Sequence, residues 1–182
     1  MTRKLRRFAL LLLCLLVPVA QAASKVAVEH RDPLDYFFHP FLYDLKAEAA
    51  DAKKAGKAAI MVMYEFDDCP YCARMKREVL SRSDVQHYFR EHFQLFQIDT
   101  RGDQTVTGFD GKNLIEKEFA RAAGVRATPT FIFYGLDTGK PLVTQVGGIY
   151  DPKQFILLGE YVVSGAYRSS SFVQYLQSKK GS

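Results

Sequence analysis

Residues 58–72 read AAIMVMYEFDDCPYC, an almost uninterrupted apolar run that ends in two acids and two cysteines. A short apolar run bounded by Gly56 and by Asp67-Asp68 is typical of a strand buried on both faces of a sheet. Pro70 favours the first turn of a helix, because its missing N–H is not needed there. The stretch therefore predicts a buried strand over 58–66 that turns into a helix at the cysteine pair.

The cysteines of this turn, Cys69 and Cys72, carry the chemistry. Cys69 falls at the helix N-terminus, where unpaired N–H groups and the macrodipole favour an anion, and Cys72 falls one turn inside. Such a setting lowers a thiol pKa from about 8.5 to about 3.5–7.5. We expect Cys69 to be the attacking thiolate and Cys72 the thiol that resolves the mixed disulfide. Pro70 supports the turn, and Tyr71 is expected at its exposed rim.

Other roles for the pair stay open from the residues alone. A structural disulfide between residues three apart closes too short a loop to constrain the unfolded chain much, and two inert buried thiols are a further possibility. A zinc site is the alternative with the most specific pattern, because Cys69, Cys72, His87 and His92 fall within the spacing of a Cys2His2 site. His87 and His92 are five residues apart, however, and so do not share one face of a helix.

Apolar periodicity predicts alternating helices and strands around this unit. We expect a small hairpin over 104–109, inside the Gly- and Asp-rich stretch 100–113. Strands are expected over 93–99, 130–134 and 141–146, and helices over 34–56, from Pro70 to Leu80, from Ser83 to Phe93, over 114–123, from Pro152 to Val163 and over 171–179. This order predicts an α/β fold with a central mixed sheet covered by helices on both faces.

The first 23 residues are typical of a secretory signal peptide. Four basic residues lie within the first seven, an uncharged stretch follows over 8–20, and Ala20-Gln21-Ala22 is a small-x-small cleavage pattern. An uncleaved membrane anchor is the alternative, although the apolar stretch is shorter than the roughly 20 residues of a spanning helix. We expect Cys14 to be removed with residues 1–23, and residues 24–182 to form one domain in an oxidising compartment, the bacterial periplasm.

Most of the net charge of +5 comes from the predicted signal peptide, because 21 basic and 20 acidic residues remain when its four basic residues are set aside. This near balance of charge argues against a polybasic surface that binds nucleic acid.

The chain resembles the thioredoxin family, with a core over about 57–165. The resemblance is carried by the strand–Cys-x-x-Cys–helix unit, by the strand that ends at Asp99, by residues 124–134 with their Thr-Pro-Thr, and by Val146-Gly-Gly148 before a helix. It implies a thioredoxin fold with an extra N-terminal helix and an insertion over 100–113, before the helix that precedes the Thr-Pro loop.

The resemblance also implies site residues beyond the cysteines. Thr128-Pro129 is expected to be a cis peptide bond facing Cys69, where its backbone pairs with an extended substrate strand. The buried acid that such enzymes use to move the proton of Cys72 would align with Met63. Glu65, nearby on the same strand, is the candidate substitute as general base.

The insertion over 100–113, Glu65 before the cysteine motif and the export pattern narrow the resemblance to the SoxW-type thioredoxins of the bacterial sulfur-oxidation system. This implies a periplasmic thiol–disulfide oxidoreductase that reduces protein disulfides through Cys69 and Cys72. No cofactor is expected apart from that redox-active disulfide, no metal and no nucleic acid partner. A membrane thiol–disulfide electron donor and a monomeric state are expected. The alternatives are a periplasmic disulfide oxidase or isomerase, and a non-catalytic binding module.

Overall fold

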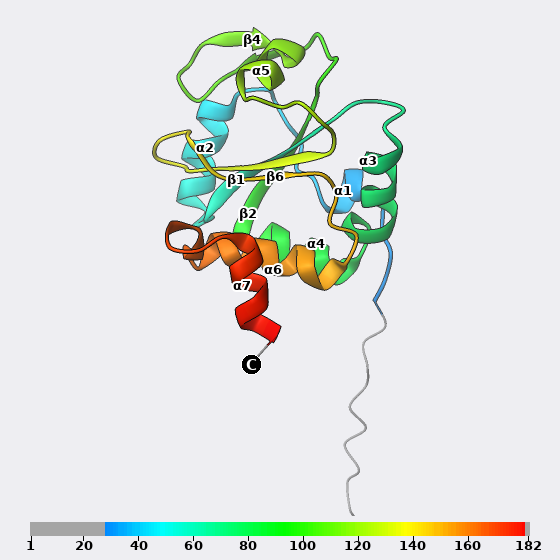
Figure 1. Cartoon of the computed structure of the whole chain (residues 1–182). Helices are drawn as coiled ribbons and strands as arrows, with labels where there is room; N and C mark the ends of the chain where they lie inside the picture. The colour runs from blue at the N-terminus through cyan, green and yellow to red at the C-terminus, as the bar shows by residue number, and fades with distance from the viewer. Residues whose placement is uncertain (1–27, 181–182) are drawn as a thin grey trace, which may run out of the picture.

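Four strands form the central sheet of the computed structural model, which describes residues 28–180. Their order is β2 (Phe93–Asp99), β1 (Ala59–Glu65), β5 (Thr130–Tyr134) and β6 (Pro141–Val146). β1 runs parallel to β2 and antiparallel to β5, which is itself antiparallel to β6, so the expected mixed sheet is confirmed. Figure 1 shows helices on both sides of this sheet. The predicted signal peptide over 1–23 lies outside the described residues.

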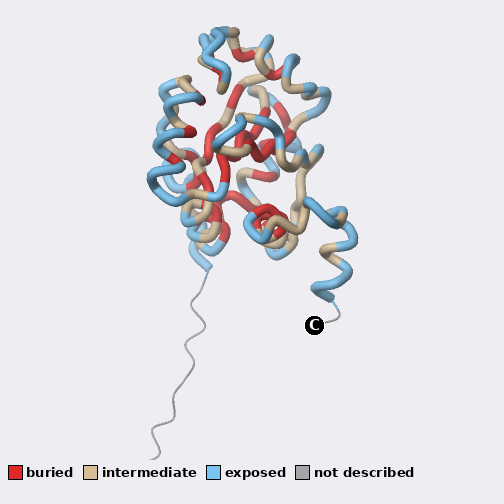
Figure 2. The backbone as a smooth tube through the Cα atoms, turned by 90° about the vertical axis from the view of Figure 1, so that its left-hand side faces the viewer, coloured by how far each residue is buried: buried red, intermediate tan, exposed pale blue. Residues whose placement is uncertain are grey.

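Alternate residues of β1 enter two apolar clusters, because successive side chains of a strand point to opposite faces. Met61 and Met63 join the cluster under α4 (Ser83–His92) and α6 (Pro152–Val163). Ile60 and Val62 join the cluster under α2 (Leu45–Lys54) and α5 (Glu116–Ala122). The tube in Figure 2 accordingly shows the sheet buried at the centre of the molecule.

The single helix expected over 34–56 is wrong: two helices replace it, α1 (Pro33–Tyr36) and α2. Pro40 lies between them and has no backbone N–H to continue a helix. The Asp44 side chain caps α2 by accepting from the N–H of Ala47 at 2.9 Å. Phe41, which supplied the helical periodicity, instead stacks on Phe96 of β2 at 4.4 Å between ring centroids.

The insertion also differs from its expected form. Its hairpin pairs β3 (Thr105–Thr107) with β4 (Asn113–Ile115), so the strands reach past the expected 104–109. Leu114 pairs with Val106 in this hairpin instead of starting the helix expected at 114, and α5 begins at Glu116. A cross-strand partner thus overrides the local helical pattern.

The remaining elements lie close to their expected positions. α3 (Pro70–Met75) continues into a π-helical turn, η1 (Lys76–Leu80). α4 begins at Ser83, as expected, and its N-cap Arg82 makes no side-chain capping bond. The Ser83 hydroxyl accepts from the N–H of Glu29 at 3.1 Å. α6 spans the expected residues, and the Asp151 side chain caps it. The chain ends with a short 3-10 turn, η2 (Ala166–Arg168), and α7 (Phe172–Lys180).

Within residues 28–180, no helix has the length and apolar character needed to cross a membrane.

Candidate functional site

The cysteine pair lies where β1 gives way to α3. The chain leaves β1 at Glu65 and turns through Asp68, whose φ of 62° is a left-handed conformation that few non-glycine residues adopt. The N–H of Cys69 donates to the carbonyl of Phe66 at 3.3 Å, and Cys69 then caps α3. The turn thereby places the first cysteine at the end of a helix, as the sequence predicted.

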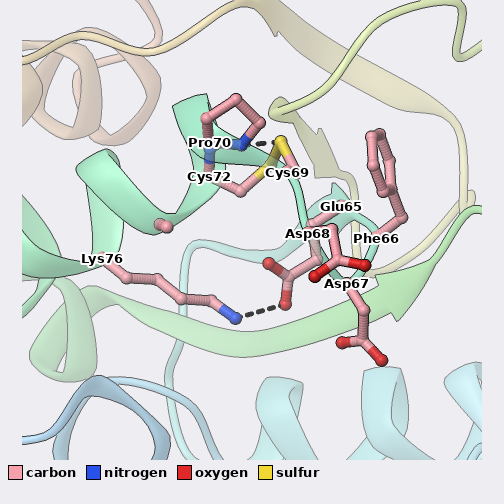
Figure 3. A pocket seen from close by; sticks show the side chains of 9 residues that line it. Glu65, Phe66, Asp67, Asp68, Cys69, Pro70, Cys72 and Lys76 are labelled. Atoms are coloured by element: carbon pink, nitrogen blue, oxygen red, sulfur yellow. Dashed lines mark hydrogen bonds and ion pairs between the residues drawn. A yellow bond between two sulfur atoms is a disulfide. The ribbon is translucent and has the colours of Figure 1, made fainter.

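Cys69 and Cys72 form a disulfide, with their Cα atoms 5.2 Å apart (Figure 3). The N–H of Cys72 points at Cys69 Sγ at 3.2 Å. An N–H aimed at this sulfur, at a helix N-terminus, stabilises negative charge on it once the disulfide is reduced. The pair is therefore arranged so that Cys69 carries the anion.

Access to the pair is narrow, since Cys69 is 4% exposed and Cys72 is 1% exposed. A pocket of about 320 Å³ opens beside them, lined by residues 65–68, by Ala73 of α3 and by Lys76 at the start of η1. Pro70 lines the same pocket, whereas Tyr71 stands out from the surface with 63% of its area exposed.

Thr128 and Pro129 lie across from the first cysteine. The Thr128 hydroxyl is 3.3 Å from Cys69 Sγ, and the Thr128–Pro129 peptide bond is cis. The carbonyl of Pro129 accepts from the N–H of Gly147 at 2.8 Å, which ties this loop to the end of β6. The structure therefore brings two segments that are far apart in sequence to the same sulfur.

Glu65 is turned into the same pocket and meets Lys76 there (Figure 3). Lys76 Nζ donates to Glu65 Oε1 at 2.5 Å, and the two side chains are 26% and 13% exposed. Burial raises the pKa of Glu65, while the hydrogen bond and positive charge of Lys76 act to lower it. Met63, the position expected to align with a buried acid, is fully buried in the apolar cluster. Asp67 and Asp68 also line the pocket but are exposed, so Glu65 is the half-buried acid of this site.

Several residues around the opening were not predicted. Lys76 is the most important of them, and its position four residues after Cys72, on the same face of a helix, was a signal that could have identified it. Arg101 lies over the ring of Phe66 at 3.7 Å, and Arg74 over the ring of Tyr150 at 4.0 Å. These last contacts come from distant loops and leave no local pattern in the sequence.

The alternative zinc site is not assembled among the described residues. Cys69 and Cys72 are bonded to each other, and residues 28–180 contain no group of three or more His, Cys, Asp or Glu placed to hold a metal ion. The His87 side chain is 84% exposed and faces Glu91 at 3.7 Å. His92 packs its ring against Tyr88, with centroids 4.7 Å apart.

Comparison with known proteins agrees with this geometry. Residues 45–163 match the family model of the thioredoxin-like domain. No curated protein matches the chain. Among solved structures, a thioredoxin-fold protein from Helicobacter pylori is 20% identical, with 67% of this chain and 84% of that chain covered and a TM-score of 0.58.

Two further structures share the same fold. A thioredoxin from Thermus thermophilus is 24% identical, with 74% of this chain and 92% of that one covered and a TM-score of 0.53. A DsbH oxidoreductase is 19% identical, with 70% and 85% covered and a TM-score of 0.52. At these identities the likeness concerns the fold.

Proposed function

We propose that this chain, which belongs to the thioredoxin-like domain family, is a thiol–disulfide oxidoreductase that reduces disulfides of partner proteins. One observation carries the proposal: Cys69 caps α3, is joined to Cys72 one turn later, and faces the hydroxyl of Thr128. A disulfide at a helix N-terminus and beside a pocket is suited to thiol exchange, because the thiolate that reduction yields is stabilised there.

The cycle starts from the reduced pair. The Cys69 thiolate attacks one sulfur of the partner's disulfide, forms a mixed disulfide with it, and releases the other sulfur as a thiolate. Cys72 then loses its proton and attacks Cys69 Sγ, which frees the second partner sulfur as a thiolate. The released partner thiolates take up protons. Two electrons pass to the partner, and the Cys69–Cys72 disulfide is left to be reduced again by a dithiol donor.

Glu65 is the proposed acceptor of the Cys72 proton. Its carboxylate lies in the pocket that Cys72 also lines, and burial raises its pKa above the ordinary value of a glutamate. A raised pKa brings a carboxylate closer to the operating pH and makes it a better base. Thr128 and Pro129 are the proposed substrate-binding loop, since Thr128 adjoins the sulfur that the partner must reach.

The periplasm, the SoxW-type assignment, the membrane electron donor and the reducing direction are finer parts of this proposal. The basic–apolar–small pattern of residues 1–23 supports export, and an exported chain without these residues keeps only Cys69 and Cys72. A disulfide oxidase or isomerase is the alternative on the same fold. A reduction potential near −270 mV supports the reductase, whereas one near −120 mV supports the oxidase, these being about the values of thioredoxin and of a strong oxidant.

Insulin reduction tests the proposal. The purified protein, kept reduced by a dithiol, should precipitate insulin by cleaving its interchain disulfides. Cys69→Ser should abolish this activity, and Cys72→Ser should accumulate a mixed disulfide with insulin because no second thiol resolves it. Turnover by Cys69→Ser would overturn the proposal. Thiols that fail to react while the protein still binds a client would point instead to a binding module.

A further inference from the structure

A second groove adjoins the catalytic pocket where α3 passes into η1. It encloses about 600 Å³ between the segment 30–34 on one side and Ala73, Lys76, Arg77 and Ser81 on the other. Ala73 and Lys76 also line the pocket beside the disulfide, so the two depressions meet along one face of the same helix. Cys69 lines the first of these two adjoining depressions.

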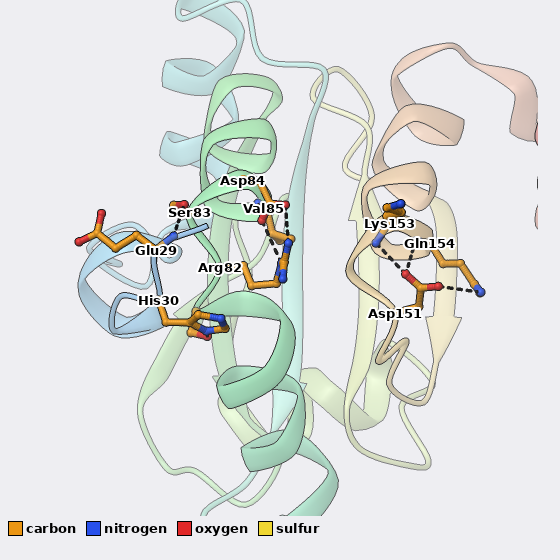
Figure 4. A network of polar contacts seen from close by, with 10 residues as sticks. Glu29, His30, Arg82, Ser83, Asp84, Val85, Asp151, Lys153 and Gln154 are labelled. Atoms are coloured by element: carbon orange, nitrogen blue, oxygen red, sulfur yellow. Dashed lines mark hydrogen bonds and ion pairs between the residues drawn. The ribbon is translucent and has the colours of Figure 1, made fainter. Parts of the chain in front are cut away.

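The wall formed by residues 30–34 begins at a β-bridge between His30 and Arg82, in the turn between η1 and α4. Figure 4 shows both residues, with Glu29 bonded to Ser83 beside them. His30 Nδ1 is 2.8 Å from the Ser81 hydroxyl, and the N–H of Arg31 donates to the Ser81 carbonyl at 2.7 Å. The N–H of Ser83 donates in turn to the Glu29 carbonyl at 2.8 Å. The groove is therefore formed before any partner arrives, which reduces the entropy that binding must overcome.

The lining of the groove combines apolar and cationic groups. Pro33, Leu34 and Ala73 supply apolar surface, and Leu34 is 54% exposed although it is a large aliphatic side chain. Three cations, Arg31, Lys76 and Arg77, line the groove against a single carboxylate, that of Asp32, which also accepts from the N–H of Leu34 as the cap of α1.

The cations differ in how far they are neutralised. Lys76 is paired with Glu65, whereas Arg77 is 68% exposed and contacts Glu78 at 3.1 Å. Arg31 lies over the ring of Tyr36 at 4.9 Å, and its Nε has no hydrogen-bond partner within the described residues. The groove thus presents positive charge beside an exposed apolar strip.

We propose that this groove binds the part of the partner polypeptide that flanks the reacting cysteine, and that it selects flanks carrying acidic and apolar side chains. The inference rests on the proposed function and names the substrate class for that site. The position of the groove beside the catalytic pocket argues for this occupant, because a chain bonded to Cys69 Sγ reaches the groove by passing over Ala73, which lines both. Charge complementarity sets the preference between partners.

Three short peptides that differ only in their flanks test the proposal. Each carries one cysteine as a mixed disulfide with thionitrobenzoate, and the flanks are Glu and Leu, Gln and Leu, or Lys and Leu. The Cys69 thiolate attacks the peptide sulfur, the disulfide bond breaks, and thionitrobenzoate leaves with the electron pair as a coloured thiolate. Its release gives the second-order rate constant with the reduced protein.

The Glu peptide should react fastest and the Lys peptide slowest, with about a tenfold spread at low ionic strength that contracts in high salt. Equal rates, or a preference for the Lys peptide, would overturn the inference while leaving the redox function standing. If none of the peptides reacts, the proposed function fails, and this inference fails with it.

Variants locate the selection. Arg77→Glu should remove or invert the preference for the Glu peptide, and Leu34→Ser should slow all three peptides to a similar degree. Lys54→Glu is the control, because it makes the same change of charge on an exposed side chain at the end of α2. This position lies near the start of β1, whereas the cysteines follow its end, so the order of the three peptide rates should not change. A preference that persists unchanged in Arg77→Glu would show that the selection arises elsewhere.

Discussion

Lys76 Nζ donates a hydrogen bond to Glu65 Oε1 at 2.5 Å and so joins the end of β1 to the helical turn that follows Cys72. Burial raises the pKa of Glu65, and Lys76 counteracts that rise by favouring the charged carboxylate. The pair therefore sets the pH above which Glu65 can accept a proton from Cys72. Both side chains line the disulfide pocket, which makes this ion pair part of the proposed chemistry.

Lys76→Met should move the acid limb of the resolution step to higher pH by about one unit, because Glu65 then ionises less readily. The measurement is the rate at which a preformed mixed disulfide on Cys69 resolves, followed by acid quench from acidic to neutral pH. Lys76→Arg should restore the profile. Arg77→Met removes a neighbouring cation that is paired with Glu78 and should not move it. An unchanged profile in Lys76→Met would show that Glu65 is not the base.

Thr128→Val should raise the pKa of the Cys69 thiol in the reduced protein by about 0.5–1 unit, because the hydroxyl 3.3 Å from the sulfur can donate to the thiolate. The pH dependence of alkylation by iodoacetamide measures this pKa. Thr128→Ser keeps a hydroxyl at the same atom and should behave like the unaltered protein. Identical pKa values in the Val and Ser variants would show that the Thr128 hydroxyl does not stabilise the Cys69 thiolate.

Much of the fold could be predicted from the sequence, because its strands are short apolar runs between clear turn signals. β2, β5 and β6 begin and end at the predicted residues, and Asp151-Pro152 starts α6. The error over 34–56 has a physical cause. Phe41 fits a helical spacing but packs on Phe96, a contact between segments far apart in sequence that no local pattern shows.

The candidate site was predictable to a similar extent. Cys69 and Cys72 could be identified from spacing and local electrostatics, and Thr128 from the family resemblance. Lys76 carries one local signal, its position four residues after Cys72. Its contact with Glu65, like that of Arg101 with Phe66, could not be predicted, because both contacts depend on where β1 ends relative to other elements. Ion pairs and cation–ring contacts of this kind are fixed by tertiary geometry.

His39 makes stability depend on pH. Its backbone N–H donates to the carbonyl of Leu95, and its Nδ1 accepts from the N–H of Leu95 at 3.0 Å. Nδ1 can accept this bond only while it carries no proton. Burial, with help from Arg90 and Lys57, lowers the pKa of His39 from 6.5 to about 4. The unfolded chain then binds the proton more tightly, so stability falls as the pH falls from 6.5 towards 4.

The free energy of unfolding should fall by about 1–2 kcal/mol over this pH range. This is less than the full pKa shift would give, because the ring is partly exposed and solvent screens its charge. Urea unfolding at the two ends of this pH window measures it. His39→Asn keeps an acceptor that does not titrate and should flatten this part of the pH dependence. An equally steep dependence in His39→Asn would assign the effect to other groups.

Tyr64 and Tyr134 share a buried hydrogen bond between their hydroxyls at 2.6 Å, which links β1 to β5. Burial raises the pKa of Tyr64 well above its ordinary value, so both rings stay neutral. Tyr64→Phe should cost about 1–3 kcal/mol, because the hydroxyl of Tyr134 loses its partner in a dry environment. The double variant Tyr64→Phe/Tyr134→Phe should cost less than the sum of the two single changes. Denaturant unfolding of the four proteins of this double-mutant cycle measures the costs. If the two single costs simply add, the hydrogen bond contributes no coupling energy.

The most direct test of the account is the titration of Cys69 in the reduced Cys72→Ser variant, followed by the ultraviolet absorbance of the thiolate. The helix N-terminus, with the N–H of residue 72 aimed at the sulfur, predicts a pKa within about 3.5–7.5. A pKa at or above that of a free cysteine, about 8.5, would contradict the claim that this fold holds Cys69 ready as the nucleophile.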